Sequence, residues 1–263
     1  MKTKRFKAAA LFLFLFVGAI APTANCADKK AIQQQTNRAY YNLKSHGLAE
    51  FRCNVLFDWD GSFSGMKTDA TWKETILPIA KQMKFQVSVG PTGAASVSHE
   101  FGQAPPSQAV ADRLRQVSEG IDQMLGGFFE TWSQLMIKPP LGGDPEAYQV
   151  EENPDGYRIT DKDNSAITMK RDFVIDTVEA KTSEFEGVVR PKFFKSADGE
   201  LLMESYDVAY TANGGASQRL SVAIQYQTVD GLLLPRTIKM SMALSQGQLD
   251  WPMTLDSCQV KKQ

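Results

Sequence analysis

The chain has 263 residues, of which 43% are hydrophobic and 22% charged, with 29 basic and 30 acidic side chains. This composition is that of an ordinary globular protein, and it excludes a disordered, collagen-like or coiled-coil chain. The net charge of -1 gives no electrostatic argument for nucleic-acid binding, which requires a basic face, although it leaves local basic patches open. We therefore expect no nucleic-acid partner.

Residues 1–27 have the pattern of a secretory signal peptide. A basic start precedes an apolar run over 8–21, which is shorter than the roughly twenty residues of a membrane-spanning helix. Small residues predict cleavage near Cys26 or Ala27, which leaves 28–263 as one exported, periplasmic domain. The residues before Cys26 are a poor match to a lipidation site, so we expect no lipid anchor there and at most transient contact with membranes.

Cleavage would leave Cys53 and Cys258 as the cysteines of the exported chain. An even pair in an oxidising compartment favours a disulfide, which would join the first predicted strand to the last. Two unpaired, buried cysteines are the alternative. Metal binding is disfavoured, because zinc sites use clustered cysteine pairs.

The first half of the chain mixes helical and strand patterns. Apolar spacing predicts a helix over 29–45, and alternation predicts a strand over 51–59. A helical stripe over 71–83 contains Pro78, which could divide it into two short pieces. A hairpin is expected from two alternating runs on either side of Pro91-Thr92-Gly93, at 84–90 and 95–101.

A long helix is predicted around 107–137, with Ser107 as its N-cap and prolines after its end. Gly126-Gly127 interrupts the apolar stripe and predicts a kink or a break. The stripe could be a packed core or a lid over a cavity. Its candidate lid or cavity residues are Val117, Ile121, Met124, Phe128, Trp132 and Leu135.

The rest of the chain has the pattern of consecutive strands. Turn sequences such as Asp198-Gly199 and Asp230-Gly231 are short, so neighbouring strands should be antiparallel. We therefore predict an α+β fold in which a large antiparallel sheet carries helices on one face. The expected strands are 147–152, 157–161, 167–171, 173–180, 185–195, 201–211, 219–228, 232–243 and 253–261.

One segment resembles the first motif of the haloacid-dehalogenase-type phosphatases, an apolar strand followed by Asp58-Trp59-Asp60-Gly61-Ser62. The resemblance would make Asp58 the nucleophile and Asp60 the general acid and base, with a magnesium ion. That fold needs a buried parallel strand, whereas Arg52 and Asn54 alternate with apolar residues as in a one-sided antiparallel strand. We expect no catalytic residue, metal or cofactor, and Asp58 and Asp60 are then solvated residues before a turn.

Two segments resemble the outer-membrane lipoprotein carrier superfamily. They are Tyr40-Tyr41-Asn42-Leu43-Lys44-Ser45 and the strand-turn-strand sequence over 226–238, which Cys258 follows in the closing strand. The resemblance implies a curved sheet that forms a half-open barrel, with an N-terminal helix and with helices covering an apolar concave face that holds acyl chains. The implied function is an exported carrier or sensor of a lipid or lipoprotein acyl chain.

The same fold could instead serve as an envelope interaction or assembly module with a filled core and protein partners. An apolar stripe on one predicted strand, Leu220, Val222, Ile224 and Tyr226, must be covered by helices or by ligand in either case. The volume beneath the predicted helix at 107–137 would distinguish the two functions.

Overall fold

The structure is a computed structural model and describes residues 28–63, 69–162, 165–181, 185–212, 218–244 and 247–263. The predicted signal peptide of residues 1–27, with its cleavage near Cys26 or Ala27, lies outside the described residues. Within the described ranges, no helix is long and apolar enough to cross a membrane.

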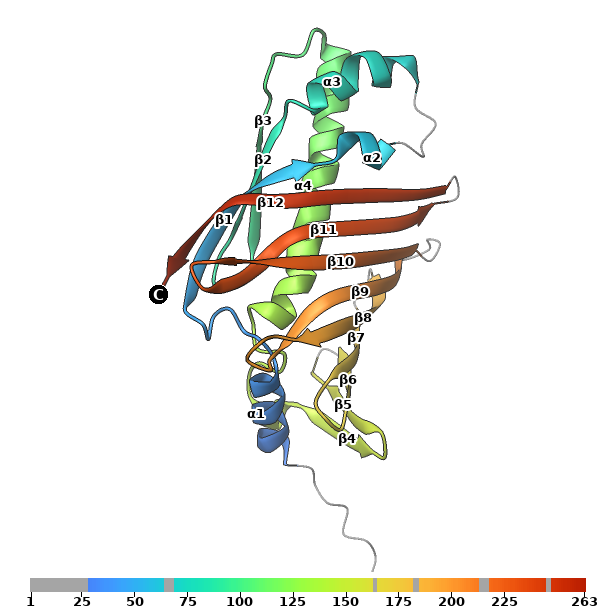
Figure 1. Ribbon diagram of the computed structural model, residues 1–263. Helices are drawn as coiled ribbons and strands as arrows, with labels where there is room; N and C mark the ends of the chain where they lie inside the picture. Colours follow the sequence, from blue (N-terminus) through green and yellow to red (C-terminus); the bar gives the residue numbers. More distant parts are fainter. Residues whose placement is uncertain (1–27, 64–68, 163–164, 182–184, 213–217, 245–246) are drawn as a thin grey trace, which may run out of the picture.

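Twelve strands form one antiparallel sheet in the order β3-β2-β1-β12-β11-β10-β9-β8-β7-β6-β5-β4 (Figure 1). From β4 to β12 each strand lies beside the next one in sequence, which confirms the predicted meander. The strands are β1 Leu48–Phe57, β2 Lys84–Val89, β3 Ala95–Glu100, β4 Gln149–Asn153, β5 Gly156–Thr160, β6 Ala166–Lys170, β7 Ile175–Lys181, β8 Phe185–Lys195, β9 Leu201–Ala212, β10 Gln218–Val229, β11 Leu232–Leu244 and β12 Gly247–Lys262.

The sheet is curved, and its end strands β3 and β4 do not pair with each other in the described part of the chain. It is therefore a half-open barrel, as the sequence resemblance implied. A long helix, α4, crosses the strands on the concave side (Figure 1). The helical segments are α1 Lys29–Ala39, α2 Trp59–Phe63, the π-helix η1 Trp72–Ile76, α3 Leu77–Ala80, α4 Gln108–Met136 and the 3₁₀ turn η2 Pro145–Ala147. The predicted α+β fold class is confirmed.

The alternating strand sequences give the sheet one apolar face. On β10, Val222 and Ile224 are buried, whereas the alternating residues Ser221 and Ala223 are exposed. Successive residues of a strand point to opposite faces, so the apolar set gathers on the side that α4 covers.

The helix α4 is continuous from Gln108 to Met136, so of the predicted kink or break at Gly126-Gly127 the break is wrong. The hydroxyl of Ser107 caps the helix by accepting a 3.4 Å hydrogen bond from the amide of Val110. Two glycines cost a helix about 2 kcal/mol relative to alanine, whereas each large apolar side chain gains about 1.5–3 kcal/mol on burial. Buried side chains flank the glycines on both sides, and their packing outweighs the loss.

The first helix is shorter than its sequence pattern suggested. It begins at an Asp28 cap and ends at Ala39, although the apolar spacing predicted a helix to 45. The backbone turns away because it pairs elsewhere: the amide of Tyr41 donates to the carbonyl of Leu201 at 3.0 Å, and that of Leu43 donates to Met136 at 2.9 Å. Tertiary contacts override the helical pattern here.

The predicted helical segment at 71–83 consists of two pieces, as Pro78 suggested. The π-helix η1 ends at Ile76, and the four-residue α3 places Pro78 in its first turn. The junction itself is helical, because Ile76 and Leu77 both have αR backbone angles and the amide of Leu77 donates to the carbonyl of Trp72, so the two pieces differ in helix type and are not separated by a break.

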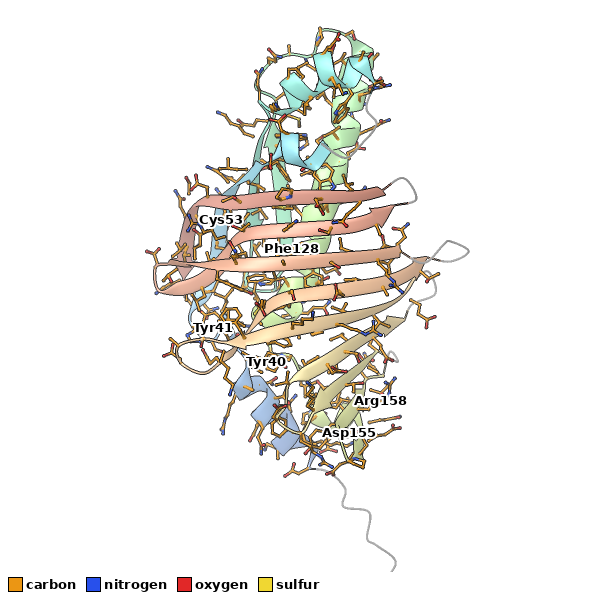
Figure 2. All side chains as sticks on the ribbon, turned by 45° about the vertical axis from the view of Figure 1, so that its right-hand side comes forward. Tyr40, Tyr41, Cys53, Phe128, Asp155 and Arg158 are labelled. Atoms are coloured by element: carbon orange, nitrogen blue, oxygen red, sulfur yellow. A yellow bond between two sulfur atoms is a disulfide. The ribbon has the colours of Figure 1, made fainter. Side chains whose placement is uncertain are left out.

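Cys53 on β1 and Cys258 on β12 form a disulfide across neighbouring strands, with a sequence separation of 205 residues (Figure 2). The predicted pairing is confirmed. The bond fastens the N-terminal hairpin region to the last strand of the meander, at the point where the sheet is not continuous in sequence.

Candidate functional site

The space between α4 and the concave face of the sheet contains a cavity of about 810 Å³. The core beneath α4 is therefore not completely filled. The wall from the sheet crosses β7 to β12, and most of its side chains are apolar. These wall residues are Val178, Ala180, Val189, Tyr206, Val208, Tyr210, Leu220, Met240, Met242 and Trp251.

The helix supplies the opposite wall. Of the predicted lid residues, Val117, Ile121, Met124 and Phe128 line the cavity. Phe128 is labelled on α4 in Figure 2, where the helix lies behind the sheet.

Trp132 and Leu135, the other two predicted lid residues, lie outside the cavity lining and belong to the packed core. The ring of Trp132 packs edge-on against Phe51 of β1, with ring centroids 6.2 Å apart. The helix α4 lies between the β1–β3 side and the β9–β12 side of the curved sheet. It therefore has more than one buried face. The apolar spacing alone cannot separate these faces.

Two glycines of α4 also line the cavity, and neither is among the predicted site residues. Gly120 and Gly127 lie seven residues apart, about two helical turns, and therefore on the same face. A Cβ atom added at either position would meet nothing within 4 Å. The backbone of the helix is thus directly exposed to the cavity at both positions. A glycine spacing of seven within an amphipathic helix is the sequence signal that could have identified them.

The polar groups of the cavity lie along one border of α4. Gln116, Gln123, Glu130 and Gln134 line it and are exposed. On the sheet side, Tyr206 is buried, and burial raises the pKa of its phenol above the usual value. Tyr206 is therefore neutral at physiological pH. The cavity wall is apolar in depth and carries uncharged amides and one carboxylate at its border.

The predicted stripe on β10 contributes little to the cavity. Leu220 lines it, whereas Val222 and Ile224 are 2% and 4% exposed and pack into the core. Tyr226 uses its hydroxyl to accept a hydrogen bond from Trp132 and to donate one to the carbonyl of Met203. The signal that points to the cavity more directly is the neighbouring strand β9, where Tyr206, Val208 and Tyr210 alternate.

A second cavity of about 580 Å³ lies beside the first, over β5 to β7. It extends beneath the loop that follows α4, from Pro140 to Tyr148. The two cavities share Gln134, Val178 and Ala180 as lining residues.

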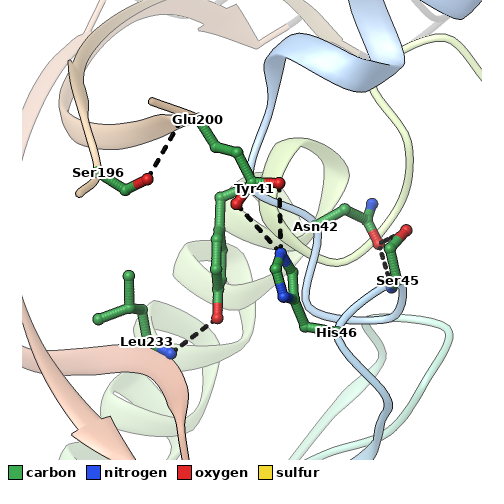
Figure 3. Close-up of polar contacts among 7 residues, drawn as sticks. All are labelled: Tyr41, Asn42, Ser45, His46, Ser196, Glu200 and Leu233. Atoms are coloured by element: carbon green, nitrogen blue, oxygen red, sulfur yellow. Dashed lines mark hydrogen bonds and ion pairs between the residues drawn. The ribbon is translucent and has the colours of Figure 1, made fainter. Parts of the chain in front are cut away.

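The segment at residues 40–45, which carries part of the family resemblance, fastens the chain beside this region. The hydroxyl of Tyr41 accepts a 2.9 Å hydrogen bond from the amide of Leu233, and its ring stacks on His46 at 4.4 Å (Figure 3). The imidazole of His46 contacts Glu200 at 3.1 Å. The hydroxyl of Tyr40 accepts a 2.7 Å hydrogen bond from the amide of Ile175. These side chains hold α1 and the sheet together and line neither of the two cavities.

The structure contradicts the parallel strand that the phosphatase interpretation needs. β1 pairs antiparallel with both β2 and β12. The carboxylate of Asp58 accepts a 2.9 Å hydrogen bond from the amide of Gly61, and Asp60 pairs with Lys81 at 2.6 Å. Asp58 and Asp60 thus act as a cap and a surface ion pair at the short helix α2.

No protein-family model matches the sequence, and no curated protein matches it. A comparison with solved structures matches the chain to a domain from Vibrio parahaemolyticus described as an outer membrane lipoprotein-sorting protein. The similarity covers 88% of this chain and 91% of that one, with 10% identity and a TM-score of 0.28.

Proposed function

We propose that this protein is an exported carrier or sensor that binds a hydrophobic ligand, a lipid or a lipoprotein acyl chain, in the cavity beneath α4. The observation that carries the proposal is the 810 Å³ cavity with an apolar wall between α4 and the concave face of the sheet. Its volume lies in the range of about 300–1,000 Å³ that is typical of ligand sites.

An acyl chain suits the chemistry of this wall. Each methylene group that moves from water into an apolar site gains about 0.8 kcal/mol, and methionine side chains such as Met124, Met240 and Met242 adapt to flexible chains. The exposed backbone at Gly120 and Gly127 leaves room for a chain to lie directly against the helix. The uncharged amides at the border suit a polar group that remains near the surface.

The disulfide between Cys53 and Cys258 supports the location. Disulfides persist in oxidising compartments, including the bacterial periplasm. Together with the predicted signal peptide, it favours an exported protein that contacts membranes transiently, to receive or release its ligand.

The alternative, an envelope interaction module, was based on a filled core. The cavity beneath α4 favours the carrier over this alternative. Binding of protein partners is compatible with the carrier function, since a carrier must collect and deliver its ligand.

The experiment is uptake of an amphiphile. Protein purified from its own periplasm should carry a bound lipid in native mass spectrometry, and delipidated protein should bind a fluorescent fatty acyl probe. Gly120→Leu places a side chain into the cavity and displaces about two methylene groups of ligand, so that affinity for the probe should fall about tenfold.

Gly126→Leu is the matched control, because Gly126 also has open space around its Cα but lines a different cavity near residues 92–95. It should bind the probe as the wild type does. A spectrum of the native protein without ligand, together with no uptake of the probe, would contradict the proposed function.

A further inference from the structure

The floor of the cavity beneath α4 contains a straight row of paired apolar side chains. Val178, Val189, Val208, Leu220 and Met242 lie on the consecutive strands β7 to β11, and each is the direct cross-strand partner of the next. All five line the cavity. Neighbouring strands are about 4.8 Å apart, so the row is about 19 Å long.

The cavity is elongated parallel to α4, which crosses the strands (Figure 1). On the sheet, Trp251 of β12 extends the lining by one strand beyond the row, to a length of about 24 Å. On the helix, the lining residues run from Gln116 to Gln134, which is about 27 Å at the usual rise of an α-helix. Two opposite walls of similar length therefore bound one long site. The inference below rests on the proposed function of this cavity.

One straight acyl chain matches this length. A zigzag of carbon atoms joined by bonds of about 1.5 Å advances about 1.3 Å per carbon, so that about 19–27 Å correspond to about fifteen to twenty carbons. A chain that follows the row contacts an apolar side chain from each strand that it crosses. The open backbone of α4 at Gly120 and Gly127 faces it from the other side.

The two ends of the cavity differ. At the β7 end the lining includes Gln134, Val178 and Ala180, none of which is buried. At the β12 end it includes two indole rings, those of Trp72 and Trp251. A chain can therefore leave the protein at the β7 end, whereas it meets an aromatic wall at the β12 end.

Trp72 is held at the end of the cavity where α4 begins. Its amide donates a 2.6 Å hydrogen bond to Asp69, and the other carboxylate oxygen of Asp69 contacts Arg113 of α4 at 3.2 Å. Arg113 lies almost one turn before Gln116, the first lining residue of α4. Trp72 also begins the π-helix η1, a rare type of helix that is frequent at functional sites. The backbone that carries this indole is thus fastened to α4 independently of any ligand.

We propose that Trp72 is a specificity-determining residue that sets the longest acyl chain the protein accepts. The chain lies along the row with its methyl end against Trp72, and the rest of the ligand leaves at the β7 end. Chains of up to about twenty carbons fit. Each further methylene group stays in water and lowers binding, relative to a membrane, about fourfold.

The test measures which chains the protein takes from a membrane. Delipidated mature protein is equilibrated with phosphatidylcholine vesicles that contain equimolar dodecanoate, hexadecanoate and tetracosanoate, and the bound acids are quantified by mass spectrometry relative to those left in the vesicles. The bilayer and the cavity gain equally from each enclosed methylene group, so dodecanoate and hexadecanoate should bind in similar amounts. Tetracosanoate is longer than the cavity and should be reduced at least about tenfold.

W72A removes the indole and makes room for further methylene groups, two of which correspond to about tenfold in binding. The share of tetracosanoate should therefore rise by at least this factor. The share of dodecanoate should stay unchanged, because this chain is too short to reach Trp72 from the β7 end. W72F keeps a smaller ring and should give a smaller rise, and it covers the case in which W72A does not fold.

K73A is the matched control. Lys73 follows Trp72 in η1, is exposed and is not among the residues that line the cavity. The variant tests whether a change in η1 alone alters the choice of chain. It should retain the profile of the wild type.

The outcomes separate the two proposals. Equal binding of tetracosanoate and hexadecanoate by the wild type would overturn the length limit, and so would an unchanged profile in W72A and W72F or the same change in K73A. Each of these results leaves the proposed function standing. Recovery of the protein without any of the three chains would contradict the proposed function and this inference together.

Discussion

The indole nitrogen of Trp132 on α4 donates a 3.1 Å hydrogen bond to the hydroxyl of Tyr226 on β10. That hydroxyl in turn donates a 2.8 Å hydrogen bond to the carbonyl of Met203 on β9. Trp132 is fully buried, so its N–H has no access to water. This pair fixes the C-terminal half of α4 to the sheet and thereby sets one end of the cavity.

Replacing Tyr226 with phenylalanine should therefore destabilise the fold. The change leaves the buried N–H of Trp132 without its acceptor and the carbonyl of Met203 without this donor, which costs about 1–3 kcal/mol. Chemical denaturation measures the loss. Y210F is the control: its hydroxyl bonds to the exposed Gln218, where water can replace it, so stability should change by less than about 0.5 kcal/mol. Equal effects of the two substitutions would contradict the anchoring role of the pair.

The disulfide makes a separate prediction. A C53A/C258A variant should lose about 2–5 kcal/mol of unfolding free energy, because the bond closes a long loop between β1 and β12. A reducing agent should lower the denaturation midpoint of the wild type and leave that of the variant unchanged. Finding two reactive thiols in the unreduced, denatured mature chain would show that the bond is absent.

The sequence predicts the strands better than it predicts the site, for a physical reason. Alternation along β10 and short turns such as Asp230-Gly231 are local, so the meander and its antiparallel order follow directly. The residues that line the cavity are harder to predict, because α4 has several buried faces and only one of them borders the cavity. Phe128 and Trp132 lie on the same apolar stripe, yet one lines the cavity and the other is packed against Phe51.

Two details of the helix predictions, the end of the first helix and the break in the long one, were wrong for a related reason. The pattern over 29–45 is helical, but Tyr41 and Leu43 form backbone hydrogen bonds with distant residues, and these contacts cannot be read from the local sequence. The expected break at Gly126-Gly127 weighed the helix propensity alone, without the burial of the side chains around it.

The junction at residues 40–46 contains two contacts that can be tested separately, the hydrogen bond of Tyr41 and the partly exposed contact between His46 and Glu200 (Figure 3). Y41F removes the acceptor of the Leu233 amide and should cost about 1–3 kcal/mol. H46Q removes the contact with Glu200, in which both side chains are partly exposed, and should cost less than about 1 kcal/mol. Unfolding free energies at neutral pH test this order. A larger loss in H46Q than in Y41F would contradict it.

The ion pair between Glu179 and Arg158 should make stability depend on pH. The hydrogen bonds from Arg158 lower the pKa of Glu179, so the folded state binds fewer protons than the unfolded state in mildly acidic solution. The pair's contribution is complete above the ordinary pKa of a glutamate and is lost as the pH falls through the lowered value. Because both side chains are more than one-third exposed, we expect less than about 1 kcal/mol.

E179Q should therefore be less stable than the wild type at neutral pH, and the difference should vanish on acidification. Stability is measured by urea denaturation over a series of pH values. The control D155N changes an exposed carboxylate on the β4–β5 turn (Figure 2) and should show the pH dependence of the wild type. A gap between E179Q and the wild type that persists in acid would mean that the charge of Glu179 is not its cause.

The glycines of α4 connect stability with the cavity. G127A should stabilise the helix by about 0.5–1 kcal/mol, because alanine is the better helix former and the added methyl group meets nothing within 4 Å. G126A should give the same gain, since its surroundings are equally open. Of Gly126 and Gly127, only Gly127 lines the cavity beneath α4, so G127A should also weaken binding of the acyl probe, by about threefold to fourfold for one displaced methylene group. G126A should bind as tightly as the wild type. Equal effects of the two substitutions on stability and on binding would contradict a role of Gly127 in the ligand site. They would mean that the acyl chain of the ligand does not lie against this face of α4.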